Sequence, residues 1–298
     1  MAMRRIVLGL AALAVVAGGV AWVVTAPDLT HSAAVAGLTG DAVAGKTVFI
    51  ATGCASCHMA PGAEGDAQLV LAGGKPFATA FGTFYAPNIS SDTEHGIGGW
   101  TPTELAGAVM DGVSPWGTHY YPALPYTAYN KMVPQDMADL AAYIATLPAD
   151  ATPSKAHEVS FPYNIRRSLG GWKALFVRDD WVLTDAPTPE LERGRYIVEA
   201  LAHCAECHTP RNALGGLQRA SWMGGAPNPE GKGLIPNITP GGLNWTEAEI
   251  VEYLTTGFTP EYDSVGGSMV HVQENMARLP DSDRAAVAAY LKAIPSVP

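Results

Sequence analysis

The sequence is poor in basic residues. Its 298 residues include 18 lysines and arginines against 28 aspartates and glutamates, which gives a net charge of −10 with the histidines neutral. A protein that binds nucleic acid needs a basic surface for the phosphates, so this composition argues against such a partner. Low-complexity and disordered tracts are also lacking, and 48% of the residues are apolar, enough for packed cores. The length fits one large domain or two ordinary ones.

Charge is also missing from a long stretch at the N-terminus, where an apolar run extends from Ile6 to Ala26. A membrane-spanning helix needs about 20 apolar residues, whereas the core of a signal peptide has about 7–15. Arg4 and Arg5 precede the run and favour a cytoplasmic start, and Trp22 suits the far interface. Residues 1–27 are therefore predicted to be an uncleaved anchor in a bacterial inner membrane, and the rest of the chain is predicted to lie in the periplasm. A removed signal peptide is the alternative.

Cysteine is scarce, and all four cysteines lie in two pentapeptides, CASCH at 54–58 and CAECH at 204–208. The pattern Cys-x-x-Cys-His is typical of c-type haem attachment. Each thiol adds across a vinyl group of the porphyrin, and the spacing places both sulfurs on one helical turn, with the histidine below the iron. The sequence predicts two covalently bound haem c groups, tethered by Cys54, Cys57, Cys204 and Cys207, with iron ligands His58 and His208.

Two other kinds of site use paired cysteines. A thioredoxin-like redox pair needs no histidine after it, and a zinc site needs all four cysteines to converge on one ion. About 150 residues separate the two pairs here. Because the complete motif occurs twice in a chain predicted to be exported, haem attachment is the favoured interpretation.

The surroundings of the two motifs repeat as well. A helical run that opens at glycine precedes each motif, and Pro-Asn-Ile follows it, at 87–89 and 236–238. A tryptophan and a capping box come next, and a last helix ends at proline. The motifs are offset by 150 residues and the last helices by 147, which indicates a duplicated domain.

Each copy is predicted to be a small all-helical haem domain whose last helix packs across its first. The expected divisions are a domain at 28–149, a connecting segment at 150–189 and a second domain at 190–298. The connecting segment is rich in aromatic residues, so we expect it to wrap on the surface of both domains.

Two features of each site concern the residues around the iron. The second ring nitrogen of an axial histidine usually donates to a carbonyl or a carboxylate, and the carbonyls of Pro87 and Pro236 are the candidates. On the far side of the second haem, Met269 is the predicted ligand, carried by a glycine-rich loop before the last helix. Met276 and the neighbouring His271 are weaker alternatives.

The far ligand of the first haem is less well defined. Leu124 lies at the centre of the equivalent loop and cannot bind iron. Met132 is the predicted ligand, because a thioether suits the iron of an electron carrier. Since Met132 corresponds to Leu279 in the repeat, it could instead seat the last helix. His119 or an open iron face are the alternatives.

Several segments resemble a known family: PNISSDTEHGIGGWTPTEL, GVSPWGTHYYPALPY, FPYNIRRSLGGWK and CAECHTPRNALGG. They are similar to the membrane-anchored dihaem cytochromes c of bacterial periplasms, a family that includes cytochrome subunits of alcohol, gluconate and related dehydrogenases. The likeness runs from about Asp41 to the C-terminus. It implies an all-α chain with two tandem class I cytochrome c domains behind an N-terminal transmembrane helix.

The resemblance also implies a function, that of an electron carrier without a catalytic site. Its redox partners would be a dehydrogenase catalytic subunit, a quinol-oxidising complex, a terminal oxidase or a small cytochrome. Two departures stand out: the dehydrogenase subunits commonly carry three haems, and they tend to have methionine at the position of Leu124.

A haem enzyme is the alternative from another class. A dihaem peroxidase or a thiosulfate-oxidising cytochrome needs one reactive haem, and Leu124 allows this for the first haem. His95 or His119 would then be the candidate acid–base residue of a peroxidase, although ordinary loop histidines are the plainer interpretation.

Overall fold

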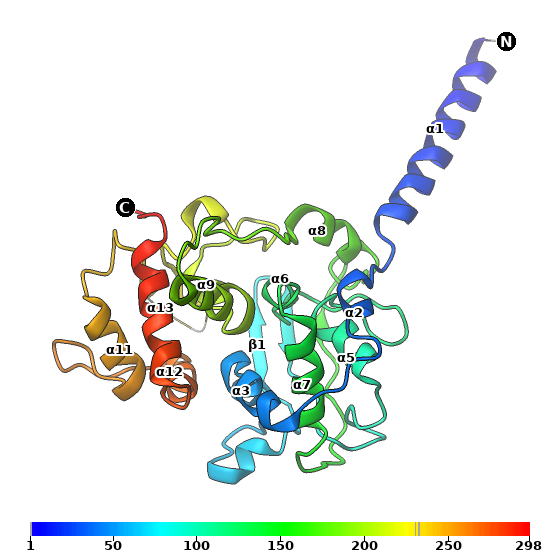
Figure 1. Ribbon diagram of the computed structural model, residues 1–298. Helices are drawn as coiled ribbons and strands as arrows, with labels where there is room; N and C mark the ends of the chain where they lie inside the picture. The colour runs from blue at the N-terminus through cyan, green and yellow to red at the C-terminus, as the bar shows by residue number, and fades with distance from the viewer. Residues whose placement is uncertain (1, 230, 232) are drawn as a thin grey trace.

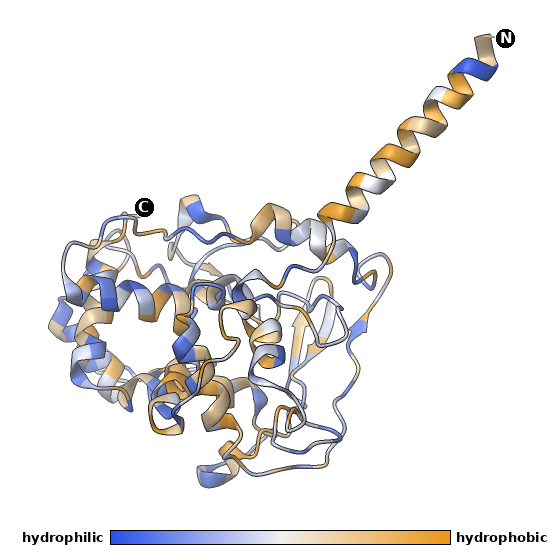
Figure 2. Cartoon of the chain, turned by 45° about the vertical axis from the view of Figure 1, so that its right-hand side comes forward, coloured by the Kyte–Doolittle hydropathy of each residue, from blue (hydrophilic) through white to orange (hydrophobic). Residues whose placement is uncertain are grey.

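The computed structural model describes residues 2–229, 231 and 233–298; Met1 of the predicted anchor lies outside this part. Two helical units lie side by side, and the N-terminal helix α1 (Ala2–Val24) projects away from both (Figure 1). In the described part α1 is the one helix long and apolar enough to cross a membrane. It buries none of its residues against the units and is apolar along most of its length (Figure 2). Its length and composition match the predicted anchor.

The helices repeat in the two units. The first unit contains α2 (Thr30–Ala33), α3 (Ala42–Thr52), α4 (Cys54–His58), η1 (Gly65–Leu69), α5 (Pro102–Val109), α6 (Tyr126–Tyr129) and α7 (Pro134–Ile144). The second contains α9 (Pro189–Tyr196), the π-helical turn η2 (Ile197–Leu201), α10 (Ala205–His208), η3 (Arg219–Ser221), α11 (Glu247–Thr256), α12 (Met269–Ala277) and α13 (Asp281–Ala293). The helical class predicted from the sequence is confirmed.

In the part of the chain that the structure describes, five short strands accompany the helices, and the sequence analysis did not predict them. β1 (Pro76–Thr79) and β2 (Gly82–Tyr85) form an antiparallel hairpin, and β3 (Glu158–Val159) of the connecting segment pairs with β2. β4 (Ala226–Pro227) and β5 (Leu234–Ile235) form a second pair. Strands of two to four residues give too few alternations to stand out in a sequence pattern.

In each unit the helix that precedes the haem motif crosses the last helix at a glycine. These pairs are α3 with α7 and α9 with α13. A Cβ atom on Gly45 of α3 would lie 1.9 Å from the carbonyl oxygen of Asp139 in α7. A Cβ atom on Gly194 of α9 would lie 2.0 Å from the carbonyl oxygen of Ala286 in α13. Only a residue without a side chain permits this approach, so the crossing predicted for the repeat is present in both copies.

The sequence analysis expected these two glycines to be the first residues of their helices, and this was wrong. α3 begins at Ala42, where the Asp41 carboxylate accepts from the Val43 amide, and α9 begins at Pro189, where Thr188 caps it. The helix starts are set by these capping residues, and the glycines are instead required three to five residues later by the helix crossing.

The two capping boxes are present as predicted. Thr101 and Glu104 exchange hydrogen bonds at the start of α5, and Thr246 and Glu249 do the same at the start of α11. Pro102 occupies the first turn of α5, where its missing N–H costs no hydrogen bond.

The connecting segment contacts both units through α8 (Ser168–Phe176) and the residues before it. The Trp172 indole donates to the Leu214 carbonyl of the second unit, at 2.8 Å. Tyr121 of the first unit donates to the Tyr163 carbonyl, at 3.1 Å. The wrapped arrangement expected from its aromatic composition is therefore observed.

We predict that Gly45→Ala and Gly194→Ala each lower the free energy of unfolding by about 1–3 kcal/mol, because the methyl group would overlap the facing backbone. Denaturant titration of the haem-loaded full chain measures this. Gly171→Ala in α8 is the matched control, since its Cβ would meet no atom closer than 3.8 Å. Equal effects of all three substitutions would contradict the crossing argument.

Candidate haem-binding sites

Each pentapeptide forms a short helix that follows a residue in the left-handed conformation. Gly53 has φ 65° before α4, and His203 has φ 44° before Cys204 and α10. This residue ends the preceding helix and turns the chain into the motif, so that the motif helix leaves at a new angle. Glycine adopts the conformation readily, whereas histidine does so at a cost.

The four cysteines fit thioether attachment better than redox or zinc chemistry. None of them forms a disulfide. Burial raises the pKa of Cys54 to about 11 and that of Cys204 to about 12. A redox pair or a zinc site works through thiolates, which a lowered pKa favours. In the described residues, moreover, no three His, Cys, Asp or Glu side chains are grouped around a possible metal ion.

Each predicted axial histidine lies beside its predicted proline carbonyl. His58 Nδ1 is 2.8 Å from the Pro87 oxygen, and His208 Nδ1 is 2.8 Å from the Pro236 oxygen. A carbonyl can only accept, so Nδ1 carries the hydrogen and Nε2 keeps its lone pair for a metal. Burial lowers the pKa of both histidines, which favours the neutral ring that an iron ligand requires. The donor set therefore fits a haem iron in both units.

The proline loops are held by the asparagine that follows each proline. Asn88 Nδ2 donates to the Asp150 carbonyl at 2.7 Å, and Asn237 Nδ2 donates to the Val297 carbonyl at 2.8 Å. Both acceptors lie beyond the last helix of their unit. The repeated Pro-Asn-Ile thus ties the histidine-orienting carbonyl to the end of the domain.

In each unit a glycine also hydrogen-bonds the backbone of the motif histidine, and the sequence analysis missed this contact. The amides of Gly73 and Gly225 donate to the carbonyls of His58 and His208, respectively, at 2.7 and 2.8 Å. Both glycines have positive φ, and a Cβ atom on Gly73 would lie 2.5 Å from the backbone of Pro87. The available signal was the glycine pair that follows each motif, Gly73-Gly74 and Gly224-Gly225, although the donor is the first glycine in one pair and the second in the other.

In the second unit Met269 is the first residue of α12, half-buried against the core. The sequence analysis placed Met269 within a glycine-rich loop. The loop instead ends at Ser268, and the helix begins at Met269, shortly after the last residues that disfavour a helix, Gly266 and Gly267. The alternative His271 bonds Glu274 on the same helix, at 3.1 Å. Met276 is 4% exposed and belongs to the core.

In the first unit Leu124 packs against the core just before α6. Met132 is 2% exposed, between α6 and α7, and its repeat counterpart Leu279 is 4% exposed. His119 is engaged elsewhere, since its Nε2 donates to the Thr25 carbonyl at the end of the anchor, at 3.0 Å. His95 is a partly exposed loop residue near Glu94.

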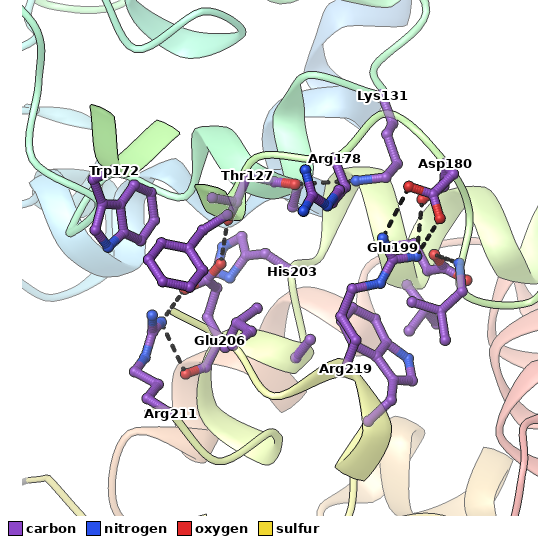
Figure 3. Close-up of a pocket in the computed structure, with 17 residues that line it drawn as sticks. Thr127, Lys131, Trp172, Arg178, Asp180, Glu199, His203, Glu206, Arg211 and Arg219 are labelled. Carbon is purple, nitrogen blue, oxygen red and sulfur yellow. Dashed lines mark hydrogen bonds and ion pairs between the residues drawn. The ribbon is translucent and has the colours of Figure 1, made fainter. Parts of the chain in front are cut away.

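The two motif helices face a common junction between the units. Thr127 of α6 donates to Glu206 of α10 at 2.7 Å, and Asn275 of α12 donates to Ser56 of α4 at 3.0 Å. A pocket beside α10 is lined from three parts of the chain, among them Thr127, Trp172, His203 and Arg211 (Figure 3). The Arg211 guanidinium pairs with the Glu206 carboxylate there.

Comparison with known proteins agrees with this geometry. The sequence matches the cytochrome c family twice, at residues 42–148 and 191–295. The chain belongs to the cytochrome c family. A relative described as a "diheme cytochrome c-type" protein, from Cereibacter sphaeroides, is 51% identical over 99% of this chain and 100% of its own length. This cytochrome c therefore carries two covalent haem c groups, and its role is electron transfer.

Other relatives are longer proteins. The fructose dehydrogenase cytochrome subunit of Gluconobacter japonicus is 36% identical over 85% of this chain, which spans 52% of that subunit. The gluconate 2-dehydrogenase cytochrome c subunit of Pantoea cypripedii is 32% identical over 95% of the chain, which spans 64% of it. The cytochrome thus spans about half to two thirds of these dehydrogenase subunits.

We predict that the purified cytochrome carries the mass of two haems and that Cys204→Ala with Cys207→Ala reduces this to one. The remaining haem should stay bound to the CASCH motif, because each unit has its own tethers and axial histidine. Intact-protein mass spectrometry after acid denaturation gives the count. A wild-type chain with fewer than two covalent additions would contradict the assignment.

Proposed function

We propose that this cytochrome is a membrane-anchored periplasmic electron carrier. It takes electrons from a dehydrogenase or a quinol-oxidising complex and passes them to a downstream acceptor such as a terminal oxidase or a small cytochrome. The observation that carries the proposal is the double set of a Cys-x-x-Cys motif with a histidine whose Nδ1 lies 2.8 Å from a proline carbonyl oxygen. The printed names of the longer relatives, which are dehydrogenase cytochrome subunits, support a dehydrogenase as the donor.

Each haem, once attached, supplies an iron that gains and loses one electron. In this proposal Cys54, Cys57, Cys204 and Cys207 hold the two porphyrins, and His58 and His208 bind the irons. The Pro87 and Pro236 carbonyls fix each ring orientation and, by accepting from Nδ1, raise the basicity of the ligating nitrogen.

Met269 is the proposed far ligand of the second haem and Met132 that of the first. A thioether opposite histidine raises the reduction potential and closes the iron to small ligands. Met269 lies at the start of a helix and is half-buried, so a modest movement could present it. Met132 is deeply buried, and its counterpart Leu279 shows that the same position also serves packing.

The proposed division assigns 1–27 to the anchor, 28–149 and 190–298 to the haem domains and 150–189 to the connection. Contacts at the base of α1 support an anchor that stays attached. Arg167 donates to the Trp22 carbonyl and to Thr25 Oγ1, and its guanidinium lies 4.2 Å from the Trp22 ring centroid. A retained helix would therefore hold the connecting segment at the membrane.

A haem enzyme with a reactive first haem is the second candidate. Leu124 favours it, because an aliphatic side chain stands in the loop where a far ligand is expected. With an open iron face, the first haem would bind and activate a small molecule instead of only relaying electrons.

We predict that Met269→Leu abolishes the weak red absorption band of methionine–iron ligation for the second haem and lowers its potential. Met132→Leu should do the same for the first haem. Met276→Leu is the control, since it changes a core methionine of the same helix with little loss of volume. If Met132→Leu leaves both haem spectra unchanged, Met132 is a packing residue.

Carbon monoxide separates the two candidate functions. With both irons fully ligated, we expect the reduced full chain to bind none, as judged from its Soret spectrum. Stoichiometric binding to one haem of the intact protein would overturn the carrier role for that haem and favour the enzyme.

The carrier role and its location are tested in native membranes. We expect the haem c spectrum of this chain to be reduced by the donor's substrate and reoxidised by oxygen, and the protein to resist alkaline extraction. Cross-linking in solubilised membranes then identifies the donor. Release into the soluble fraction would contradict the anchor, and an absence of redox cycling would contradict the carrier.

A further inference from the structure

The junction between the units is reciprocal. Ser56 and Glu206 are the third residues of their motifs, and each accepts a hydrogen bond from the helix before the last helix of the other unit. Asn275 of α12 donates to Ser56, and Thr127 of α6 donates to Glu206. Each haem-binding helix is thus held by the opposite unit, in the manner of a two-fold contact within one chain.

His203 lies at the centre of this arrangement. Its Nε2 is 3.3 Å from the Thr52 carbonyl oxygen, at the end of the helix before the first motif. Its ring stands edge-on to Tyr129, with centroids 5.7 Å apart, and the Tyr129 hydroxyl donates to the same carbonyl at 3.0 Å. One carbonyl has two lone pairs, so it can accept from both donors.

The backbone of His203 is in a conformation that its side chain disfavours. Its φ of 44° is left-handed, and the equivalent residue of the first unit is Gly53, with φ 65°. A histidine that keeps such a conformation and does not ligate iron needs a compensating contact. The bond to Thr52 and the ring contact with Tyr129 provide it.

The contact joins the two segments that carry the first tether of each haem. His203 directly precedes Cys204, and Thr52 lies two residues before Cys54, with its Oγ1 3.2 Å from Cys54 Sγ. A single hydrogen bond between His203 and Thr52 therefore completes a short path from one tether to the other.

We propose that His203 is a positioning residue for electron transfer between the two haems. It locks the two motif helices against each other and so fixes the separation and the relative angle of the porphyrins tethered to them. In the transfer, one electron leaves one ferrous iron and reduces the ferric iron of the other haem, with no bond made or broken. The rate of electron tunnelling falls steeply with the separation of the two haems. A contact that keeps this separation constant therefore also keeps the transfer rate constant.

The test compares His203→Gly and His203→Asn in the full chain loaded with two haems. Glycine relieves the backbone and removes the contact, whereas asparagine tolerates the left-handed conformation and keeps an N–H donor. Tyr262→Gly is the matched control, because Tyr262 is also left-handed, with φ 64°, but is 89% exposed and far from the motifs in sequence.

Two readouts report the geometry directly. When two haems are held close together at a fixed angle, the Soret circular dichroism of the reduced protein contains a positive and a negative lobe, an exciton couplet, which is called the paired band below. Laser photoreduction gives the rate of electron transfer between the two haems. We expect His203→Gly to lose most of the paired band and to slow the transfer. His203→Asn should retain most of both, and Tyr262→Gly should match the wild type. A wild-type band and rate in His203→Gly, or an equal loss in Tyr262→Gly, would overturn the proposal.

If His203→Gly does not take up both haems, Tyr129→Leu provides the second test. This substitution removes the ring that His203 contacts edge-on and leaves His203 and both motifs intact. We expect a weaker paired band and a slower transfer, and an unchanged band and rate would overturn the proposal. The carrier role is judged separately by redox cycling in membranes, so a failure of this proposal leaves that result standing.

Discussion

The hydrogen bond from the motif histidine to a proline carbonyl is the constraint on which each candidate haem site depends. It fixes the tautomer and the ring orientation, and therefore leaves Nε2 as the nitrogen that would bind an iron. Much of each domain serves to hold that carbonyl still. Asn88 and Asn237 tie the proline loop to the chain beyond the last helix, and the last helix is in turn clasped against the first at Gly45 and Gly194. The haem ligand is thus supported by the whole unit.

Duplication of this unit produced two sites with the same frame and different surroundings. The motif helix of the first unit presents Ser56 to the junction, and that of the second presents Glu206, which pairs with Arg211 and accepts from Thr127. Gly53 and His203 occupy the same turn, but only His203 can reach across to the other unit. The frame is shared because both copies keep the glycine at the helix crossing and the asparagine that anchors the proline loop, whereas the side chains at the junction differ between the copies.

The connecting segment and the first unit both hold the base of α1. Arg167 bonds Trp22 and Thr25, and His119 bonds Thr25, so α1 leaves the first unit at a defined place. The same segment reaches the second unit through Trp172.

The sequence alone determined the haem count, the repeat and the apolar N-terminal helix, and it predicted the cysteine tethers and the iron-binding histidines, because covalent haem attachment and membrane insertion impose local sequence patterns. The capping boxes belong to the same class, since both partners lie within one helical turn. Only the tertiary structure revealed the roles of Gly73 and Gly225, the true start of the helix that bears Met269 and the contact between His203 and Thr52. The two glycine contacts join residues 15 and 17 positions apart, and the contact of His203 with Thr52 joins residues 151 apart. No local pattern encodes such meetings, because they arise only when separately formed helices pack.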